Sequence, residues 1–257
     1  MSQSTVDYLS CDSADDAIRS LALAYNVEKE KIIRVFQKDW PDFLHNEVEN
    51  EVFQDELLTW CMAQHMRCDD VKDSDVISAH YHRGLFNGDE NWFHKGLLNS
   101  LDGTAEFLDY LRPMLPSNCD FSHIKALALS NVLDRTQGEF EWGGGPYAFD
   151  RLDDAKGAQE TGLDYSTPEF LMGRFWDSKS NDRHCASTLI KLSRDNFLPV
   201  VVKFTADNSR AREYVSNLWH YLHRKKFQID LEPNYYTFIG RGLTVPKERI
   251  LELIIVL

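Results

Sequence analysis

Histidine and arginine side chains gather in one stretch of the sequence, residues 78–100. His80 and His82 alternate along a run that has the composition of a β-strand, so both imidazoles should lie on one face. His94 follows twelve residues after His82. Imidazole nitrogens bind metals and also form hydrogen bonds with substrates. The stretch therefore predicts a three-histidine metal site, as in a metal-dependent hydrolase, or a substrate pocket, or histidines packed into a core.

A glycine run followed by an aromatic residue is the second candidate site. Residues 143–145 are glycines, Pro146 follows them, and Tyr147 begins a run typical of a strand. Glycine permits positive φ and close approach of the backbone to a ligand. Because Pro146 follows the glycines, the run lacks the strand–glycine–helix context of a nucleotide phosphate loop. The run indicates either a flexible hairpin loop or a ligand site in which Tyr147 stacks on a planar group.

The elements that position these residues divide the chain in two. Residues 12–68 show helical spacing of apolar side chains, with a capping box beginning at Ser13. Residues 68–75 are polar and acidic, and from Val76 onward short strand-like runs alternate with helical ones. This pattern predicts a helical N-terminal domain at 1–70 and an α+β domain at 71–257.

A helix-turn-helix at residues 18–36 is an alternative role for the N-terminal helices. Its second helix begins Glu28-Lys29-Glu30-Lys31, and two acidic residues facing phosphates would weaken DNA binding. The sequence therefore favours two packed helices joined by a tight turn, with DNA binding by Lys29 and Lys31 as the other hypothesis.

The overall composition and charge indicate which partners and which cellular compartment to expect. The net charge of −13 opposes broad coating of nucleic acids, although it permits a local basic groove. Five cysteines, without any Cys-x-x-Cys pair, predict reduced thiols and no zinc ribbon. The first residues lack the features of a secretory signal, and the C-terminal apolar run is shorter than the ~20 residues of a membrane span. We expect a cytoplasmic protein that does not bind membranes.

The order of three motifs along residues 76–257 resembles that of ADP-ribosyltransferases. In that superfamily a histidine-bearing strand precedes a Gly-Leu element, a glycine-rich approach leads to a tyrosine-bearing strand and a helix, and a Val-Pro element introduces the last strand. The corresponding segments here are residues 79–98, 144–156 and 245–250. The resemblance implies an α+β fold with a mixed or antiparallel split β-sheet, preceded here by the helical N-terminal domain.

The resemblance also assigns residues to an NAD+ site. His82 matches the histidine that binds the adenosine-ribose hydroxyls, and His80 is the alternative on the same strand face. Arg83 would neutralise a phosphate, and Gly84 belongs to the same cofactor-binding segment. Tyr147 matches the tyrosine that stacks on nicotinamide. Gly145 would let the backbone approach the cofactor.

The catalytic glutamate of the family has no direct counterpart in this chain. Counted back from Val245-Pro246, its position falls near Tyr235 or Tyr236, and the nearest carboxylate is Glu232. Because that glutamate stabilises the oxocarbenium-like transition state, its absence from the expected position would lower the rate of catalysis. Glu232, Tyr236 and Tyr147 are the residues we expect to take part in catalysis.

The function implied by the resemblance is NAD+-dependent mono-ADP-ribosylation of a protein or nucleic acid, with NAD+ as a substrate. Such an enzyme would suit a toxin of a toxin–antitoxin or phage-defence system, or an effector, restrained by an antitoxin or regulatory protein. The missing glutamate leaves a second hypothesis, a degenerate NAD-binding or helix-turn-helix regulatory protein. The histidine set leaves a third, the metal-dependent hydrolase.

Overall fold

The computed structural model describes residues 7–42, 55–72, 76–136, 144–157, 167–172, 180–229 and 237–256. The chain forms two compact units. The first comprises residues 1–80, 150–154 and 205–234, and the second comprises residues 81–149, 155–204 and 235–257. Strands β1 (Val76–Phe86) and β3 (Leu198–Asn208) each contribute residues to both units.

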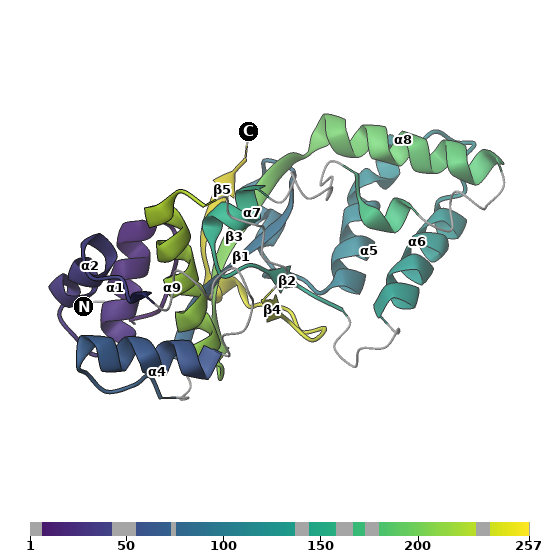
Figure 1. The fold of residues 1–257 in the computed structure, drawn as a ribbon. Helices are drawn as coiled ribbons and strands as arrows, with labels where there is room; N and C mark the ends of the chain where they lie inside the picture. Colours follow the sequence, from purple (N-terminus) through teal and green to yellow (C-terminus); the bar gives the residue numbers. More distant parts are fainter. Residues whose placement is uncertain are drawn as a thin grey trace. The chain divides into compact units, whose positions relative to one another are not determined.

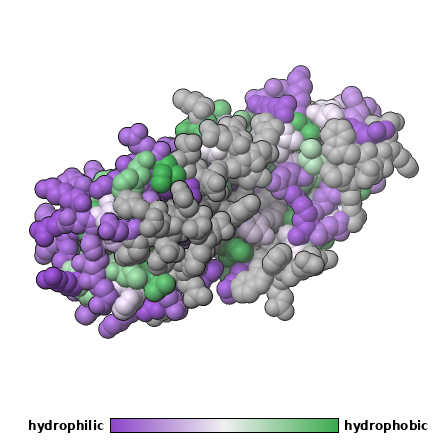
Figure 2. All heavy atoms as spheres, viewed as in Figure 1, coloured by the Kyte–Doolittle hydropathy of each residue, from purple (hydrophilic) through white to green (hydrophobic). Residues whose placement is uncertain are grey.

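The first unit is a bundle of helices around one apolar core. Its described helices are α1 (Ala14–Ala24), α2 (Lys29–Gln37), α4 (Asp55–Met66) and α9 (Ala211–Phe227), which lie together in Figure 1. The buried residues of this core come from all four helices. Hydrophilic side chains cover much of the visible face of α1, α2 and α4 in Figure 2. Helices α1 and α2 pack as a pair joined by a turn in which Asn26 has φ 49°.

The first unit differs from the domain predicted at residues 1–70 because α9 belongs to it. Leu218 and Trp219 of α9 are buried in the same core as Leu21, Ile32 and Met62. The indole nitrogen of Trp219 also donates a hydrogen bond to the Tyr25 hydroxyl, with an N···O distance of 3.0 Å. A boundary read from the composition of a continuous segment cannot include a helix that returns much later in the chain.

The second unit combines a small sheet with helices, so the structure confirms the α+β class. Within the described residues the main sheet has the order β1–β3–β5, and β5 (Ile250–Ile255) pairs antiparallel with β3. A second, two-stranded sheet pairs β2 (Tyr147–Ala148) with β4 (Phe238–Ile239). The two sheets meet where Tyr81 and Phe149 form an antiparallel bridge. The ADP-ribosyltransferase-like arrangement of the sheets stays a prediction.

The helices of the second unit are α5 (Ser100–Leu111), α6 (Phe121–Thr136), α8 (Ser180–Asn196) and the later part of α7 (Leu152–Gly157). The described part of this unit also contains short 3-10 helices, η1 (Glu90–Phe93), η2 (Arg112–Met114), η4 (Glu169–Leu171) and η6 (Lys247–Arg249). Neither α6 nor α8 was predicted from the sequence.

A disulfide bond joins Cys119 and Cys185, which are 66 residues apart in sequence. It corrects the expectation that all thiols are reduced: Cys11, Cys61 and Cys68 are the cysteines outside this disulfide bond. The pair was missed because wide spacing carries no information about which cysteines meet. Among the described helices, none combines the length and apolar character needed to cross a bilayer.

Candidate functional site

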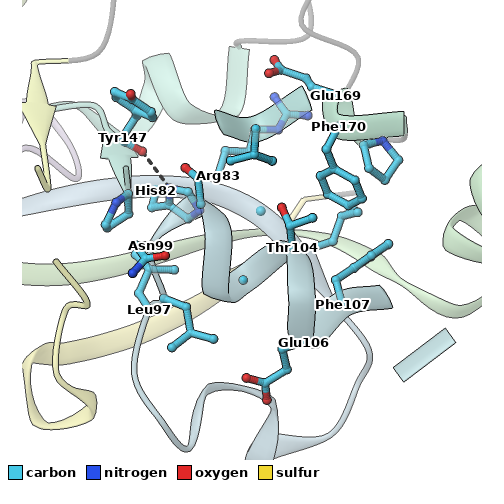
Figure 3. A pocket seen from close by; sticks show the side chains of 18 of the residues that line it. His82, Arg83, Leu97, Asn99, Thr104, Glu106, Phe107, Tyr147, Glu169 and Phe170 are labelled. Carbon is cyan, nitrogen blue, oxygen red and sulfur yellow. Dashed lines mark hydrogen bonds between the residues drawn. The ribbon is translucent and has the colours of Figure 1, made fainter. Parts of the chain in front are cut away.

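A cavity of about 330 Å³ lies in the second unit, within the size range of small-molecule sites. Its walls are largely apolar, and the apolar side chains that line it include Trp92, Phe93, Leu97, Phe107, Val132 and Phe170. Figure 3 shows Phe107 and Phe170 on the opposite side of the cavity from His82 and Tyr147, with Thr104 between them. The cavity therefore offers flat apolar surfaces at one side and polar atoms at the other.

His82 faces this cavity from β1 in a fixed orientation. Its Nδ1 lies 2.7 Å from the carbonyl oxygen of Tyr147, as the dashed line in Figure 3 marks. A carbonyl oxygen only accepts hydrogen bonds, so Nδ1 carries the proton and Nε2 keeps its lone pair. Burial lowers the pKa of His82, although the hydrogen bond to the Tyr147 carbonyl acts in the opposite direction. His82 is therefore held as a neutral imidazole with Nε2 as an acceptor.

Backbone contacts bring the three motif segments together around the cavity. Leu97 and Val245 form an antiparallel bridge with N···O distances of 2.9 Å in both directions. Gly96 has φ 95°, and a Cβ atom there would lie 2.1 Å from the Val245 carbonyl oxygen, so only glycine fits. Tyr81 and Phe149 exchange two further backbone hydrogen bonds, with N···O distances of 2.8 and 3.0 Å. Segments from residues 79–98, 144–156 and 245–250 thus meet in one place.

Tyr147 follows the glycine run and Pro146, and the loop packs against its ring. Gly145 has φ 58°, and a Cβ atom there would lie 3.4 Å from the Tyr147 ring and 2.8 Å from the Ser100 hydroxyl. The Tyr147 hydroxyl accepts a hydrogen bond from the Gly144 backbone nitrogen at 3.4 Å. The glycines therefore let the loop fold closely against the tyrosine ring, and both Tyr147 and Pro146 line the cavity.

Arg83 and Gly84 also line the cavity, but they contribute differently. Arg83 is buried, and its Nη1 donates to the carbonyl oxygens of Ala155 and Lys156 at 3.3 and 3.2 Å. These carbonyls belong to the last turn of α7, where helical carbonyls have no partner within the helix. Gly84 leaves space beside His82, because a Cβ atom there would lie 3.4 Å from Nε2.

The structure does not place His80 on the cavity. His80 is 3% exposed, its Nδ1 lies 2.8 Å from an Asp150 carboxylate oxygen, and its Nε2 lies 2.8 Å from the Ser78 hydroxyl. Serine hydrolases use this order of hydrogen bonds. Ser78, however, is 0% exposed and also accepts a hydrogen bond from Asn208, so no substrate reaches it. His80 instead anchors the first part of β1 within the first unit.

The three histidines of residues 78–100 do not form a cluster. His94 is exposed, and its Nδ1 lies 2.8 Å from the Asn91 carbonyl oxygen. His80 and His82 each use Nδ1 for a different partner. In the described part of the chain, no group of three His, Cys, Asp or Glu side chains has the geometry of a metal site. The geometry therefore favours the substrate-pocket interpretation over the metal-dependent hydrolase.

Glu232, Tyr235 and Tyr236 lie outside the described residues, so their catalytic roles stay predictions. Among the described residues that line the cavity, the carboxylates are those of Glu106 and Glu169, and both form ion pairs. Glu106 pairs with Lys95 at 3.0 Å, and Glu169 pairs with Arg135.

The cavity residues contributed by α5, α6 and η4 were not predicted from the sequence. Among these are Asn99, Thr104, Phe107, Arg135, Glu169 and Phe170. One of them carried a signal: Asn99 precedes a helical run and caps α5 by accepting from the Asp102 backbone nitrogen at 2.9 Å. The others are separated by long stretches of sequence and share no spacing.

Comparisons of the whole chain with models of protein families, with curated proteins and with solved structures gave no match.

Proposed function

We propose that the second unit is an NAD+-dependent mono-ADP-ribosyltransferase domain that modifies a macromolecular acceptor. The observation that carries this proposal is the meeting of three distant motif segments around one cavity. Backbone hydrogen bonds join Tyr81 of the histidine strand to Phe149 of the glycine–tyrosine run, and Leu97 of the Gly-Leu element to Val245 of the Val-Pro element. Motif order in a sequence does not require such contacts, so their presence supports a shared site.

The chemistry of the cavity suits the binding of NAD+. His82 presents an unprotonated Nε2, which accepts a hydrogen bond from a ribose hydroxyl. Aromatic walls and the Tyr147 ring supply stacking surfaces for the adenine or nicotinamide rings. In the reaction, the nicotinamide–ribose C–N bond breaks, and a nucleophilic atom of the acceptor bonds to the ribose while its proton goes to solvent. Apolar walls limit water, which would otherwise compete as the acceptor.

The charge distribution bears on the acceptor. The first unit contains 13 Lys and Arg against 24 Asp and Glu, a net charge of −11, whereas the second contains 15 against 17, a net charge of −2. A polyanionic acceptor such as a nucleic acid would therefore meet little repulsion at the second unit. This keeps both acceptor classes, protein and nucleic acid, within the proposal. We further propose that the chain acts as a toxin or effector restrained by an antitoxin or regulatory protein.

Label transfer tests the proposal directly. The purified protein is incubated with NAD+ labelled in the ADP-ribose part, together with a cell extract. We expect labelled macromolecules with the wild type and a loss of at least about tenfold with His82→Ala, since a buried hydrogen bond to a ribose hydroxyl of NAD+ is lost. His94→Ala is the matched control, because that imidazole is exposed and does not line the cavity.

The same experiment separates the alternatives. Nuclease and protease treatment of the products identifies the acceptor class. NAD+ binding that depends on His82 without any transfer would assign a degenerate nucleotide-binding domain. If wild type neither binds NAD+ nor transfers label, the proposal is wrong.

A further inference from the structure

Arg135 is a cation of the cavity with a partner that is easily exchanged. It lies in the last turn of α6, lines the cavity, and forms an ion pair with Glu169 of η4. The side chains of Arg135 and Glu169 are 48% and 62% exposed. An ion pair this exposed contributes little to stability, because solvent screens it and both side chains lose freedom. Exchange of the carboxylate for a stronger anionic partner therefore costs little.

The segment that carries Glu169 does not depend on this ion pair. Asn131, one turn before Arg135 on α6, donates from its amide to the carbonyl oxygens of Phe170 and Met172 at 3.0 and 2.8 Å. Leu171 is 1% exposed and packs into the core of the second unit. These contacts hold η4 against α6, so Glu169 is free to move without loss of the cavity wall.

The other charged groups of the cavity have structural partners. Arg83 is buried and donates to two carbonyl oxygens at the end of α7. Glu106 pairs with Lys95, and Figure 3 shows it at the far end of the cavity from Tyr147. Near Glu169, Arg194 donates to the Thr167 hydroxyl at 2.8 Å. Among the described lining residues, Arg135 is thus the cation whose partner is both charged and well exposed.

We propose that Arg135 is the phosphate-binding residue of the cavity, and that its ligand is a nucleotide whose phosphate displaces Glu169. The inference rests on the proposed function in that both need a nucleotide in the cavity. The aromatic walls formed by Phe107 and Phe170 receive the flat base, His82 meets a sugar hydroxyl, and the guanidinium binds the phosphate in its two-pronged geometry. Glu169 competes with the phosphate for the guanidinium in the empty cavity.

Two substitutions in the ion pair should change affinity in opposite directions. Binding of ADP and of adenosine is measured by calorimetry. Arg135→Ala should weaken ADP binding by about ten- to a hundredfold, as expected for a hydrogen bond between charged groups, and leave adenosine binding unchanged. Glu169→Ala should strengthen ADP binding by about two- to fivefold, because it removes the competing carboxylate. Arg135→Lys keeps the charge and should lie between Arg135→Ala and wild type.

Lys125→Ala is the matched control. Lys125 lies on α6 and pairs with Asp109 at 2.7 Å, but it does not line the cavity, so its loss removes one positive charge from the same helix only. It should leave ADP binding unchanged, and thermal unfolding should show that all four variants are folded. If Arg135→Ala and Glu169→Ala change ADP affinity in the same direction, or if neither changes it, the pair is structural and the inference is wrong.

Failure of this inference is distinguishable from failure of the proposed function. NAD+ binding and label transfer that are unaffected by Arg135→Ala overturn the phosphate role alone. ADP binding with the opposite effects of the two substitutions, but without label transfer, supports the phosphate role and overturns the transferase. A cavity that binds neither ADP nor NAD+ overturns both.

Discussion

Removal of the disulfide between Cys119 and Cys185 should destabilise the second unit by about 4 kcal/mol. The magnitude follows from the loop that the bond closes: a cross-link across 66 residues reduces the entropy of the unfolded chain by this amount. Both cysteines are buried in the apolar cluster that also contains Phe107 and Leu108. Cys119 lies just before α6, and Cys185 lies on α8. The perturbation is the double substitution of both cysteines by alanine.

Hydrogen exchange of individual segments is the suitable measurement. The chain has two compact units, so one unfolding midpoint for the whole protein does not report on either unit alone. In α6 and α8, amides that exchange only through unfolding of the second unit should lose about three orders of magnitude of protection, which corresponds to 4 kcal/mol. Amides in α1 and α2 should be unaffected. Cys61→Ala is the control, because Cys61 is a free cysteine of the first unit.

A thiol count decides whether the bond exists in solution. Alkylation of the unreduced, unfolded protein should modify three thiols, those of Cys11, Cys61 and Cys68, and reduction should expose the remaining two. Modification of all five thiols before reduction would show that the Cys119–Cys185 bond is absent in solution. If α6 and α8 are equally protected from hydrogen exchange with and without the bond, the bond does not stabilise the second unit by about 4 kcal/mol.

Gly84→Ala should weaken NAD+ binding about fivefold by calorimetry without lowering the melting temperature, because its methyl group would lie 3.4 Å from Nε2 of His82 and occupy the space of the ligand hydroxyl. Unchanged affinity would show that Nε2 does not contact NAD+. Gly96→Ala should lower the free energy of unfolding by at least about 2 kcal/mol, since its Cβ would lie 2.1 Å from a backbone oxygen. Gly88→Ala is the control: Gly88 also has positive φ but has open space around it, so this substitution introduces backbone strain alone and should cost less. Burial, with two nearby arginines, lowers the pKa of His220 to about 4. The unfolded chain binds a proton below about pH 6.5 that the folded unit does not, so stability should fall from pH 6.5 to 4. His220→Gln should flatten that fall in urea unfolding, and parallel curves would contradict the assignment.

Local patterns in the sequence were sufficient for several elements. Ser13 caps α1 as predicted, accepting from the Asp16 backbone nitrogen at 3.2 Å. Helix α5 ends at Leu111 and passes directly into η2, because Pro113 has no backbone N–H to continue the α-helical hydrogen bonds. The run from Val76 forms β1. In each case the cause lies within a few residues of the element.

Long-range contacts were beyond sequence reasoning. His80 and His82 share a strand face by periodicity, yet Asp150 takes the first into a buried network and the Tyr147 carbonyl orients the second at the cavity. Nothing local distinguishes these two outcomes. Helix α6 is a different case, because Ile124, Ala128, Asn131 and Val132 are buried at helical spacing. That signal was present, and Asn131, a polar residue on the apolar side, weakened it.

The discontinuous first unit has a consequence for the making of the protein on the ribosome. Its core is incomplete until α9 supplies Leu218 and Trp219, and α9 emerges only after most of the second unit has been translated. The apolar faces of the nascent helices α1, α2 and α4 therefore stay exposed until α9 has been synthesised. Chaperones bind apolar surface that is exposed in this way. A premature stop anywhere before residue 211 would leave both units unfinished. The two units should consequently reach their folded states late in synthesis and close together in time.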